Sequence, residues 1–324
     1  MEIVRDFSVI IPTFNRLGYL KQAIESCFIG NETLDIEVIV VDDGSTDGSV
    51  QYLKSLESNM VSCYFQQRKG PQFARNLGKS KANGRYIKFL DDDDYLEPGA
   101  LQKEFLFSKE DADLILSECV FVNPNGTVIG IKYHYSSKNI FYGLFQEGSY
   151  LPVQVSYKRS FISDLNWDNN LGCRQDFHFL TEVILRKPKT VFSTFIAGTI
   201  RQHSGERVSS LNNVKSRCSI NHLIILRSAF ERLKEEVFFD KYLKDVALLG
   251  LYKWAYLIAV SDFKLFKTTV KRIESYDSKF FTTKKFNIII RLFGVVSYVK
   301  IVNLPRRIKY FISNWNIIYM LNGK

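Results

Sequence analysis

A short apolar run that ends in four consecutive carboxylates constrains the fold more than any other stretch of this chain. Residues 86–90 have the composition of a buried strand, and Asp91–Asp94 follow directly. Such a cluster repels itself unless a positive charge lies within it. A strand that ends in carboxylates places them at the carboxyl edge of a sheet, where open α/β sheets bind ligands.

Two interpretations of this acidic stretch follow from its chemistry. Mg²⁺ and Mn²⁺ take oxygen ligands and commonly reach a phosphate through one or two carboxylates. The stretch therefore indicates a metal–diphosphate site. The alternative is a solvated acidic turn that caps a helix starting near Pro98.

Strand and helix patterns alternate through the first half of the chain. Buried strand patterns occupy 7–11, 37–41 and 61–66, and helical spacing occupies 17–28, 49–56 and 73–82. This alternation predicts an α/β fold with a mostly parallel sheet flanked by helices. The sequence has neither a GxGxxG loop after its first strand nor a GxxxxGK[ST] loop, which disfavours dinucleotide and P-loop sites.

The second half of the chain is expected to be less regular. We expect a hairpin over 113–133, a helix over 175–186 and an extended segment over 190–201. Amphipathic helical patterns dominate from Val214 to about Ile273. We therefore predict a first domain over residues 1–210 and a mainly helical C-terminal extension over 211–324.

The positive charge of the chain belongs to its C-terminal tail. The net charge is +10, and residues 278–324 contain nine Lys or Arg and no Asp or Glu. The segment 284–309 is apolar, aromatic and basic, and Arg291 and Lys300 interrupt its apolar run, so it is expected to lie on a membrane surface rather than span it. A core or dimer helix with a solvated basic face is the alternative. The tail has no nucleic-acid recognition motif, so no nucleic acid partner is expected.

Cysteine usage and the N-terminus favour a reducing compartment. The five cysteines are widely spaced and form no CxxC pair, and the chain enters a strand pattern without a signal peptide. We therefore expect a cytoplasmic protein, peripheral at the inner face of the cell membrane. The sequence leaves the oligomeric state open.

Five short motifs, in order, resemble the family-2 glycosyltransferases of GT-A fold. They are Val9–Arg16, Val40–Asp47, Gly70 with Phe73–Gly78, Asn83–Tyr86, and Leu90–Asp94 with Pro98. The resemblance covers about residues 5–210. It implies transfer of a sugar from a nucleotide-diphosphate donor, expected to be a UDP-sugar, to a hydroxyl of a glycan or lipid-linked glycan. Inversion at the sugar and a role in cell-surface polysaccharide biosynthesis are further expectations.

The resemblance implies where the nucleotide binds. Asp43 and Arg75 match the positions that hold the base. Pro12 and Thr13 match residues that line the same pocket.

The resemblance also identifies Asp91–Asp93 as the DXD motif. Asp93 would ligate the metal, Mn²⁺ or Mg²⁺, and Asp91 or Asp92 would meet the ribose or a metal-bound water. Asp94, a fourth carboxylate, is also common in this family, which leaves the role of each aspartate open by one position.

A general base and a further metal ligand follow from the same resemblance. Asp176 matches the second member of an acidic pair at a helix start, where it would accept the proton of the acceptor hydroxyl. The first member is Gln175 here, not Glu, and the alternative role of Asp176 is that of a helix N-terminal residue favoured by the dipole. His203 matches a histidine that can contact the metal or the diphosphate in relatives. The alternative is that His203 is a loop histidine without a ligand role. Trp167 stacks on an acceptor sugar or belongs to the core.

Two other functions compete with sugar transfer. A nucleotidyltransferase shares the sheet architecture but requires a glycine-rich basic loop after the first strand, and Pro12–Arg16 is not one. A non-catalytic nucleotide-sugar-binding module predicts loss of the base or of the DXD carboxylates, and the chain retains both.

Overall fold

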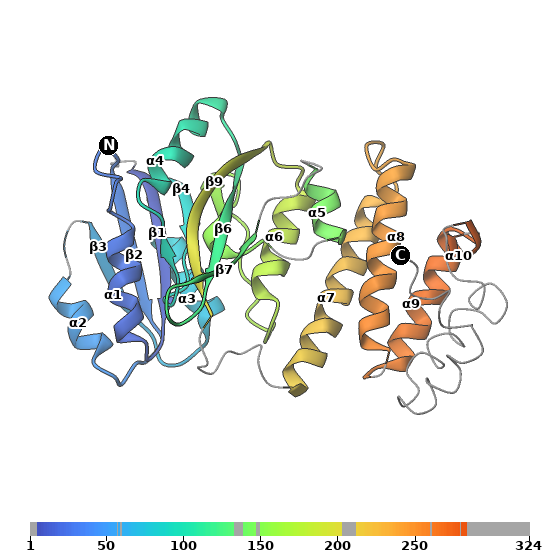
Figure 1. Cartoon of the computed structure of the whole chain (residues 1–324), viewed down its shortest axis with the longest axis horizontal. Coiled ribbons are helices and arrows are strands. Elements are labelled where there is room, and N and C mark those ends of the chain that lie inside the picture. Colours follow the sequence, from blue (N-terminus) through green and yellow to red (C-terminus); the bar gives the residue numbers. More distant parts are fainter. Residues whose placement is uncertain are drawn as a thin grey trace. The chain divides into compact units, whose positions relative to one another are not determined.

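The computed structural model describes residues 5–56, 58, 60–132, 139–146, 150–202, 212–259, 261–278 and 280–283. The chain forms two compact units, residues 1–206 and residues 207–324 (Figure 1). The first unit contains the sheet, and the second contains the long helices that were predicted from Val214 onward.

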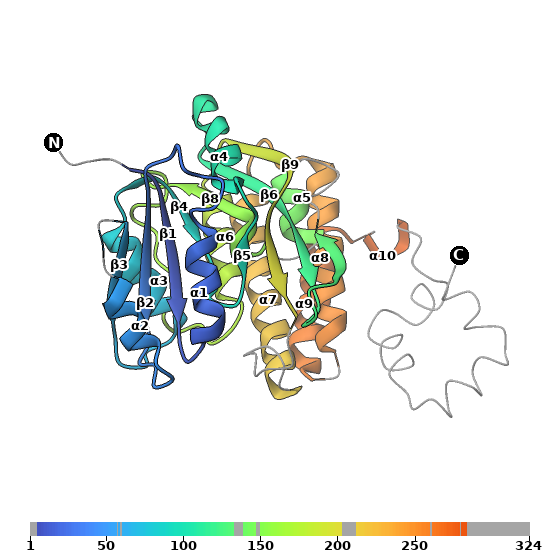
Figure 2. The ribbon, with the colours of Figure 1, turned by 60° about the vertical axis from the view of Figure 1, so that its left-hand side comes forward.

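Nine strands among the described residues form one sheet in the first unit (Figure 2). They are β1 (Arg5–Thr13), β2 (Ile36–Asp42), β3 (Val61–Phe65), β4 (Gly84–Phe89), β5 (Tyr95–Leu96), β6 (Leu114–Val122), β7 (Val128–Lys132), β8 (Val155–Lys158) and β9 (Thr190–Arg201). The strand order is β3-β2-β1-β4-β8-β6-β9-β5, with β7 paired to β6. The half from β3 to β4 is parallel. In the other half β8 is antiparallel to both of its neighbours, whereas β9 is parallel to β6.

Six α-helices among the described residues accompany this sheet. They are α1 (Leu17–Ser26), α2 (Ser49–Leu56), α3 (Pro71–Lys81), α4 (Ala100–Phe105), α5 (Ile140–Gln146) and α6 (Gln175–Leu185), with two short 3₁₀ turns, η1 (Leu106–Glu110) and η2 (Pro152–Gln154). The predicted α/β fold is confirmed. Helix α3 starts two residues earlier than expected because proline is favoured in the first helical turn, where its missing N–H is no loss.

The two faces of β1 bury different helices. Val9 and Ile11 are fully buried and belong to the same apolar cluster as Leu20 of α1. Ile10 points to the opposite face, where a Cβ added at Gly78 of α3 would lie 2.4 Å from its Cγ2. Glycine at this position therefore lets α3 pack directly on the strand.

An aromatic cluster fixes α6 against β4. The Phe89 ring lies 5.0 Å from the Trp167 ring and 5.8 Å from the Phe179 ring, and Trp167 and Phe179 stack at 4.7 Å. Trp167 is only 2% exposed. Of the two roles considered for Trp167, its position in the core is the one observed.

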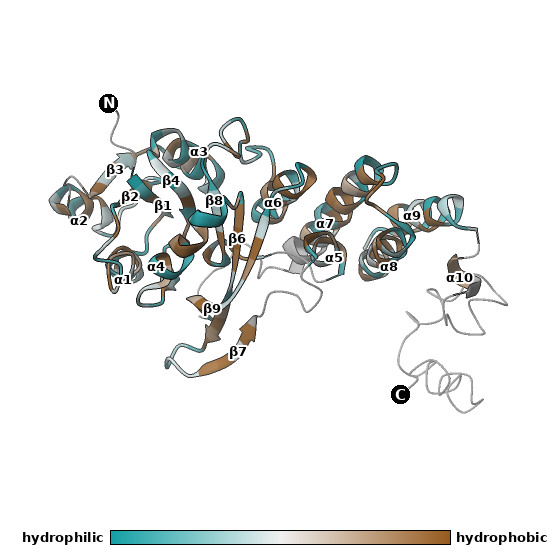
Figure 3. Cartoon of the chain, turned by 90° about the horizontal axis from the view of Figure 1, so that it is seen from above, coloured by the Kyte–Doolittle hydropathy of each residue, from teal (hydrophilic) through white to brown (hydrophobic). Residues whose placement is uncertain are grey.

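The second unit consists of helices. The described ones are α7 (Asn212–Leu233), α8 (Lys241–Ile258), α9 (Phe263–Tyr276) and α10 (Phe280–Thr283). Helices α7, α8 and α9 each carry hydrophobic and hydrophilic residues (Figure 3), as the amphipathic patterns predicted. No helix in the described ranges combines the length and apolar character needed to cross a lipid bilayer.

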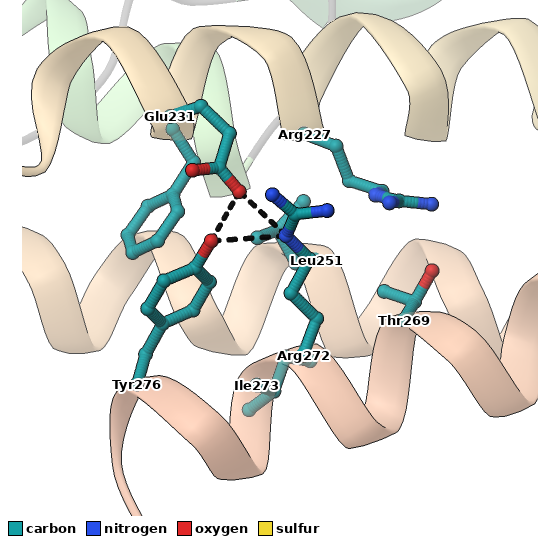
Figure 4. Close-up of a pocket in the computed structure, with 8 residues that line it drawn as sticks. Arg227, Glu231, Leu251, Thr269, Arg272, Ile273 and Tyr276 are labelled. Atoms are coloured by element: carbon teal, nitrogen blue, oxygen red, sulfur yellow. Dashed lines mark hydrogen bonds and ion pairs between the residues drawn. The ribbon is translucent and has the colours of Figure 1, made fainter.

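Polar side chains cap two helices of this unit and link two of them through an ion pair. Asp240 and Asp262 accept hydrogen bonds from Leu243 N and Leu265 N, which caps the N-termini of α8 and α9. Glu231 of α7 pairs with Arg272 Nε of α9 at 2.7 Å beside a small pocket (Figure 4). The basic tail lies almost entirely outside the described residues.

Candidate active site

The parallel strands bring three sequence-distant loops to one edge of the sheet. Thr13, the last residue of β1, is in register with Asp42, the last residue of β2. Thr13 O accepts a hydrogen bond from Asp43 N at 2.8 Å, and Thr13 Oγ1 donates to Asp92 Oδ2 at 2.8 Å. Pro12 lies buried one residue earlier in β1.

The acidic turn after β4 is enclosed by protein. Asp92, Asp93 and Asp94 are 7%, 8% and 6% exposed. Helix α4 begins after Gly99 without a side-chain cap. The interpretation of this stretch as a solvated, helix-capping turn is therefore wrong.

The end of β9 holds the acidic turn in place. Arg201 N donates to Asp94 Oδ1 at 3.2 Å, and Arg201 Nη1 donates to Asp93 O at 2.9 Å. The strand β5, which follows the turn, pairs with β9 through Tyr95 and Leu96. The carboxylates are thus fixed between two strands that are about one hundred residues apart in sequence.

Three of the four carboxylates form a group that fits a hard divalent cation. One oxygen from each of Asp91, Asp93 and Asp94 lies within 4.8 Å of the others. Asp94 N donates to Asp91 O at 3.1 Å, and this turn brings the first and fourth aspartates together. Carboxylate oxygens are the ligands that Mg²⁺ and Mn²⁺ prefer. Asp94, whose role the sequence left open, belongs to this group, whereas Asp92 turns toward β1.

Two arginines balance the negative charge of the turn. Arg75 Nη2 donates to Asp91 Oδ1 at 2.6 Å. Arg16 Nη1 contacts Asp93 Oδ2 and lies 3.4 Å from Asp92 Oδ1. The sequence analysis gave Arg16 no role, although it is the last residue of the first motif, Val9–Arg16.

Burial controls the protonation of these carboxyls. Burial raises the pKa of Asp92 to about 7, although Arg16 and the Thr13 hydroxyl oppose the rise. Burial also raises the pKa of Asp91. The guanidinium of Arg75 opposes this rise, and the negative charges of Asp93 and Asp176 add to it. A bound cation would stabilise the charged forms of this group.

Asp43 organises the loop before α3. Its carboxylate accepts hydrogen bonds from Gln66 Nε2 at 2.7 Å, Lys69 N at 2.7 Å and Gly70 N at 2.9 Å. Asp43 is buried. It therefore shapes the predicted base pocket through the 66–70 loop.

Arg75 lies where the predicted base pocket meets the acidic turn. Its guanidinium stacks 4.6 Å from the centre of the Trp167 ring. Its Nε is buried and has no hydrogen-bond partner in the described part of the chain. Asp91 and Trp167 therefore hold Arg75 in place, with its Nε enclosed by protein.

Asp176 faces the same turn from α6. The helix begins at Gln175, after Arg174 in the left-handed conformation at φ 64°. The Asp176 carboxylate is one of the charges that raise the pKa of Asp91. The predicted base therefore lies close enough to the acidic turn for its charge to act on Asp91.

Helix α3 holds the segment that leads to Asp176. Asn76 Nδ2 donates to Trp167 O at 2.9 Å, and Trp167 N donates to Asn76 Oδ1 at 2.8 Å. Gln175 Nε2 donates to Gln72 Oε1 at 3.0 Å. The glutamine that departs from the family pair thus joins α6 to α3, an interaction that sequence spacing does not reveal.

The remaining predicted ligand is not placed. His203 lies outside the described residues. Its role as a metal ligand stays a prediction.

Proteins with similar sequences are glycosyltransferases. The family pattern described as glycosyl transferase family 2 matches residues 8–170, half of the 324-residue chain. An uncharacterized glycosyltransferase of Haemophilus influenzae is 29% identical over 72% of this chain and 94% of its own length.

Two further relatives have more specific names. The chondroitin synthase of Pasteurella multocida is 35% identical over 40% of this chain and 14% of its own length. The GalNAc(5)-diNAcBac-PP-undecaprenol beta-1,3-glucosyltransferase of Campylobacter jejuni is 36% identical over 35% of this chain and 38% of its own length. The matched part is thus less than two fifths of either relative.

Solved structures share the fold. S. aureus TarS 1–349 in complex with UDP-GlcNAc has a TM-score of 0.54 and 21% identity, and covers 84% of this chain and 89% of that chain. The mannosyltransferase PcManGT from Pyrobaculum calidifontis, in complex with GDP-Man and Mn²⁺, has a TM-score of 0.52 and 14% identity, and covers 92% and 86%. The predicted GT-A fold is confirmed.

Proposed function

Since this chain belongs to glycosyl transferase family 2, we propose that it moves a sugar from a UDP-sugar to a hydroxyl of a glycan or lipid-linked glycan, with inversion and with Mn²⁺ or Mg²⁺. The names of the chondroitin synthase and the undecaprenol-linked glucosyltransferase support a role in polysaccharide synthesis. The UDP-GlcNAc bound to TarS and the Mn²⁺ bound to PcManGT support the donor and the cofactor.

One observation carries the proposal. The carboxylates of Asp91, Asp93 and Asp94 form a compact group at the carboxyl edge of the parallel strands, and Asp176 acts on it electrostatically. A metal-dependent sugar transfer needs an acidic group for the cation and a separate carboxylate for proton removal. In this proposal the group of Asp91, Asp93 and Asp94 holds the cation, and Asp176 of α6 removes the proton.

The donor is held by the acidic turn and the pocket around Asp43. Asp93, together with Asp91 and Asp94, would hold the divalent cation, which supplies charge neutralisation for the leaving diphosphate when bound. Asp43 shapes the base pocket through the backbone of Lys69 and Gly70, and Arg75 lies between Asp91 and Trp167. Asp92 stays with β1 through Thr13 and presents its second oxygen toward Arg16.

Asp176 is the general base of this proposal. It would accept the proton of the acceptor hydroxyl as that oxygen attacks the anomeric carbon. Inversion requires the attacking oxygen and the leaving diphosphate to lie on opposite sides of that carbon. The packing of Phe179, one helical turn later, against Trp167 limits the movement of α6 and so of Asp176.

The C-terminal tail supports a place at the inner face of the cell membrane. Its nine basic residues without an acidic one would attract anionic lipid headgroups. A lipid-linked acceptor would be reached from such a position.

Donor turnover tests the proposed reaction. The full-length chain is incubated with UDP-, dTDP- and GDP-sugars, with and without Mn²⁺, and the released nucleotide is measured. We expect release of UDP that requires the cation and is lost in Asp93→Ala. Asp111→Ala, which changes an exposed acid of the same unit, serves as the matched control and should keep full activity.

Two further measurements separate the competing functions. In a parallel reaction with a nucleoside triphosphate and a sugar 1-phosphate, formation of a nucleotide sugar with release of pyrophosphate would indicate a nucleotidyltransferase. Calorimetric binding of a donor with no product over many hours would indicate a non-catalytic module. Either result would overturn the proposed function.

A further inference from the structure

Arg16 occupies a position that neither the motif nor the proposed reaction explains. It follows β1 by three residues and precedes α1, and its side chain is 26% exposed. Asn15, directly before it, has a φ of 53° and accepts a hydrogen bond from Thr46 N at 2.7 Å. This local geometry directs Arg16 away from solvent and toward the acidic turn.

The guanidinium of Arg16 uses a carboxylate that the metal group also needs. Its Nη1 contacts Asp93 Oδ2, and Asp93 is one of the three residues whose oxygens lie within 4.8 Å of one another. A guanidinium stays protonated in proteins, so Arg16 adds a positive charge beside the position of a cation.

A guanidinium displaced from Asp93 has a second partner available in the proposed reaction. Its planar fork matches two oxygens of a phosphate as well as it matches a carboxylate. The diphosphate of a donor must lie close to the cation that neutralises it. Arg16, anchored beside that cation, is thus able to exchange one anion for the other.

We propose that Arg16 is an exchangeable counter-cation, which pairs with Asp93 in the absence of a divalent cation and transfers to the donor diphosphate when the cation takes Asp93. The inference rests on the proposed function. It assigns to Arg16 two effects of opposite sign: it weakens the binding of the free cation and strengthens the binding of the nucleotide in the presence of the cation.

Two binding measurements on the full-length chain test this exchange. Mn²⁺ alone is titrated by electron paramagnetic resonance, and UDP is titrated by calorimetry in saturating Mn²⁺. For Arg16→Gln we expect Mn²⁺ affinity to rise about tenfold or more and UDP affinity to fall about tenfold or more, as expected for loss of one charge-assisted contact. Arg16→Lys, which keeps the charge but not the fork, should leave Mn²⁺ affinity near that of the parent.

A matched control separates site electrostatics from general charge. Arg186→Gln removes an arginine of the same unit whose bidentate partner is Asp164, and it should change neither affinity. A misfolded Arg16→Gln variant would lose both affinities, and opposite shifts cannot arise that way. Unchanged or weaker Mn²⁺ binding, or unchanged UDP binding, in Arg16→Gln overturns the proposal.

The outcome is independent of sugar transfer. The Mn²⁺ titration contains no donor, and UDP is a product that need not be turned over. If the chain transfers no sugar, the proposed function fails, and opposite shifts in the two affinities would still support Arg16 as the exchanging group.

Discussion

Asp176 is the residue on which the proposed chemistry depends most directly. We expect Asp176→Asn to lower kcat by about 10²- to 10⁴-fold, because the amide has nearly the same size but cannot accept a proton. Calorimetric affinity for UDP with Mn²⁺ should change little, since the proposed donor contacts come from other loops. The two measurements together separate loss of the base from loss of the site.

A neighbouring acid provides the control for this variant. Asp164→Asn changes an exposed carboxylate that pairs with Arg186 and precedes Asp176 in the sequence. This variant should keep the parental kcat. A donor affinity that falls with the rate would make Asp176 structural. A near-normal rate would move the base elsewhere, with Asp168 or Glu182 as the next candidates.

At this scale the sequence predicted positions better than partners. Asp91–Asp94 had to lie at the sheet edge because they follow a strand directly, and they do. The contact between Arg16 and Asp93 spans 77 residues and depends on the pairing of β1 with β4. The left-handed backbone of Asn15 also directs Arg16; asparagine favours this conformation, but the β1–β4 pairing has no local sequence signal.

At the scale of the elements, strand β4 carries a buried charge that contributes to the stability of the sheet. Lys88 Nζ lies 2.8 Å from Glu104 Oε1 of α4, and both side chains are 0% exposed. Ser117 and Ser156 donate to the same carboxylate from β6 and β8. This network therefore joins three strands to one helix.

Removing one member of the pair should be costly. Lys88→Met should reduce the free energy of unfolding by about 3–5 kcal/mol, because it leaves the Glu104 charge buried without its counter-ion. Urea denaturation measures the change. The double variant Lys88→Met/Glu104→Leu should lose less than the single variant. The prediction fails if the double variant is the less stable of the two.

A control of the same kind exists on β8. Lys158 pairs with Asp111, whose side chain is 68% exposed. Lys158→Met should cost no more than about 1 kcal/mol, since exposed ion pairs contribute little.

The coupling between α3 and α6 can be measured as well. Gln72 accepts from Gln175 Nε2 at 3.0 Å and donates to Asn169 O at 3.2 Å. In a double-mutant cycle of Gln72→Ala and Gln175→Ala, monitored by urea denaturation, we expect an interaction energy of about 0.5–1.5 kcal/mol. Additive effects would show that the amide contact contributes nothing.

Element types were predictable from the sequence, but their order in the sheet was not. Alternating strand and helix patterns gave the parallel half from β3 to β4, because consecutive strands of such units pair or neighbour one another. Strand β8 enters between β4 and β6, and β9 pairs with β6 across nearly eighty residues. These pairings depend on which strand edges remain unpaired after the first half of the sheet forms, and local sequence patterns do not indicate this.

At the scale of the whole molecule, the excess positive charge lies in a different part of the sequence from the residues of the proposed reaction. The net charge is +10, and nine basic residues without an acid lie beyond Asp277. By this count the rest of the chain has a net charge of only about +1. The family pattern covers residues 8–170, so the tail lies outside it.

Truncation after Thr283 tests what the tail does. The shortened chain should keep its affinity for UDP with Mn²⁺ but lose binding to vesicles that contain phosphatidylglycerol, measured by cosedimentation, because each basic residue near an anionic surface contributes about 1 kcal/mol. Replacing Arg306, Arg307 and Lys309 by glutamine in the full-length chain keeps the apolar residues and should weaken vesicle binding in the same direction. Binding of the parent should also fall as salt is raised from 50 to about 500 mM, since added ions screen the attraction. Vesicle binding that is absent from the parent, or unaffected by salt and by the glutamine variant, would mean that the tail serves instead as a core or dimer segment.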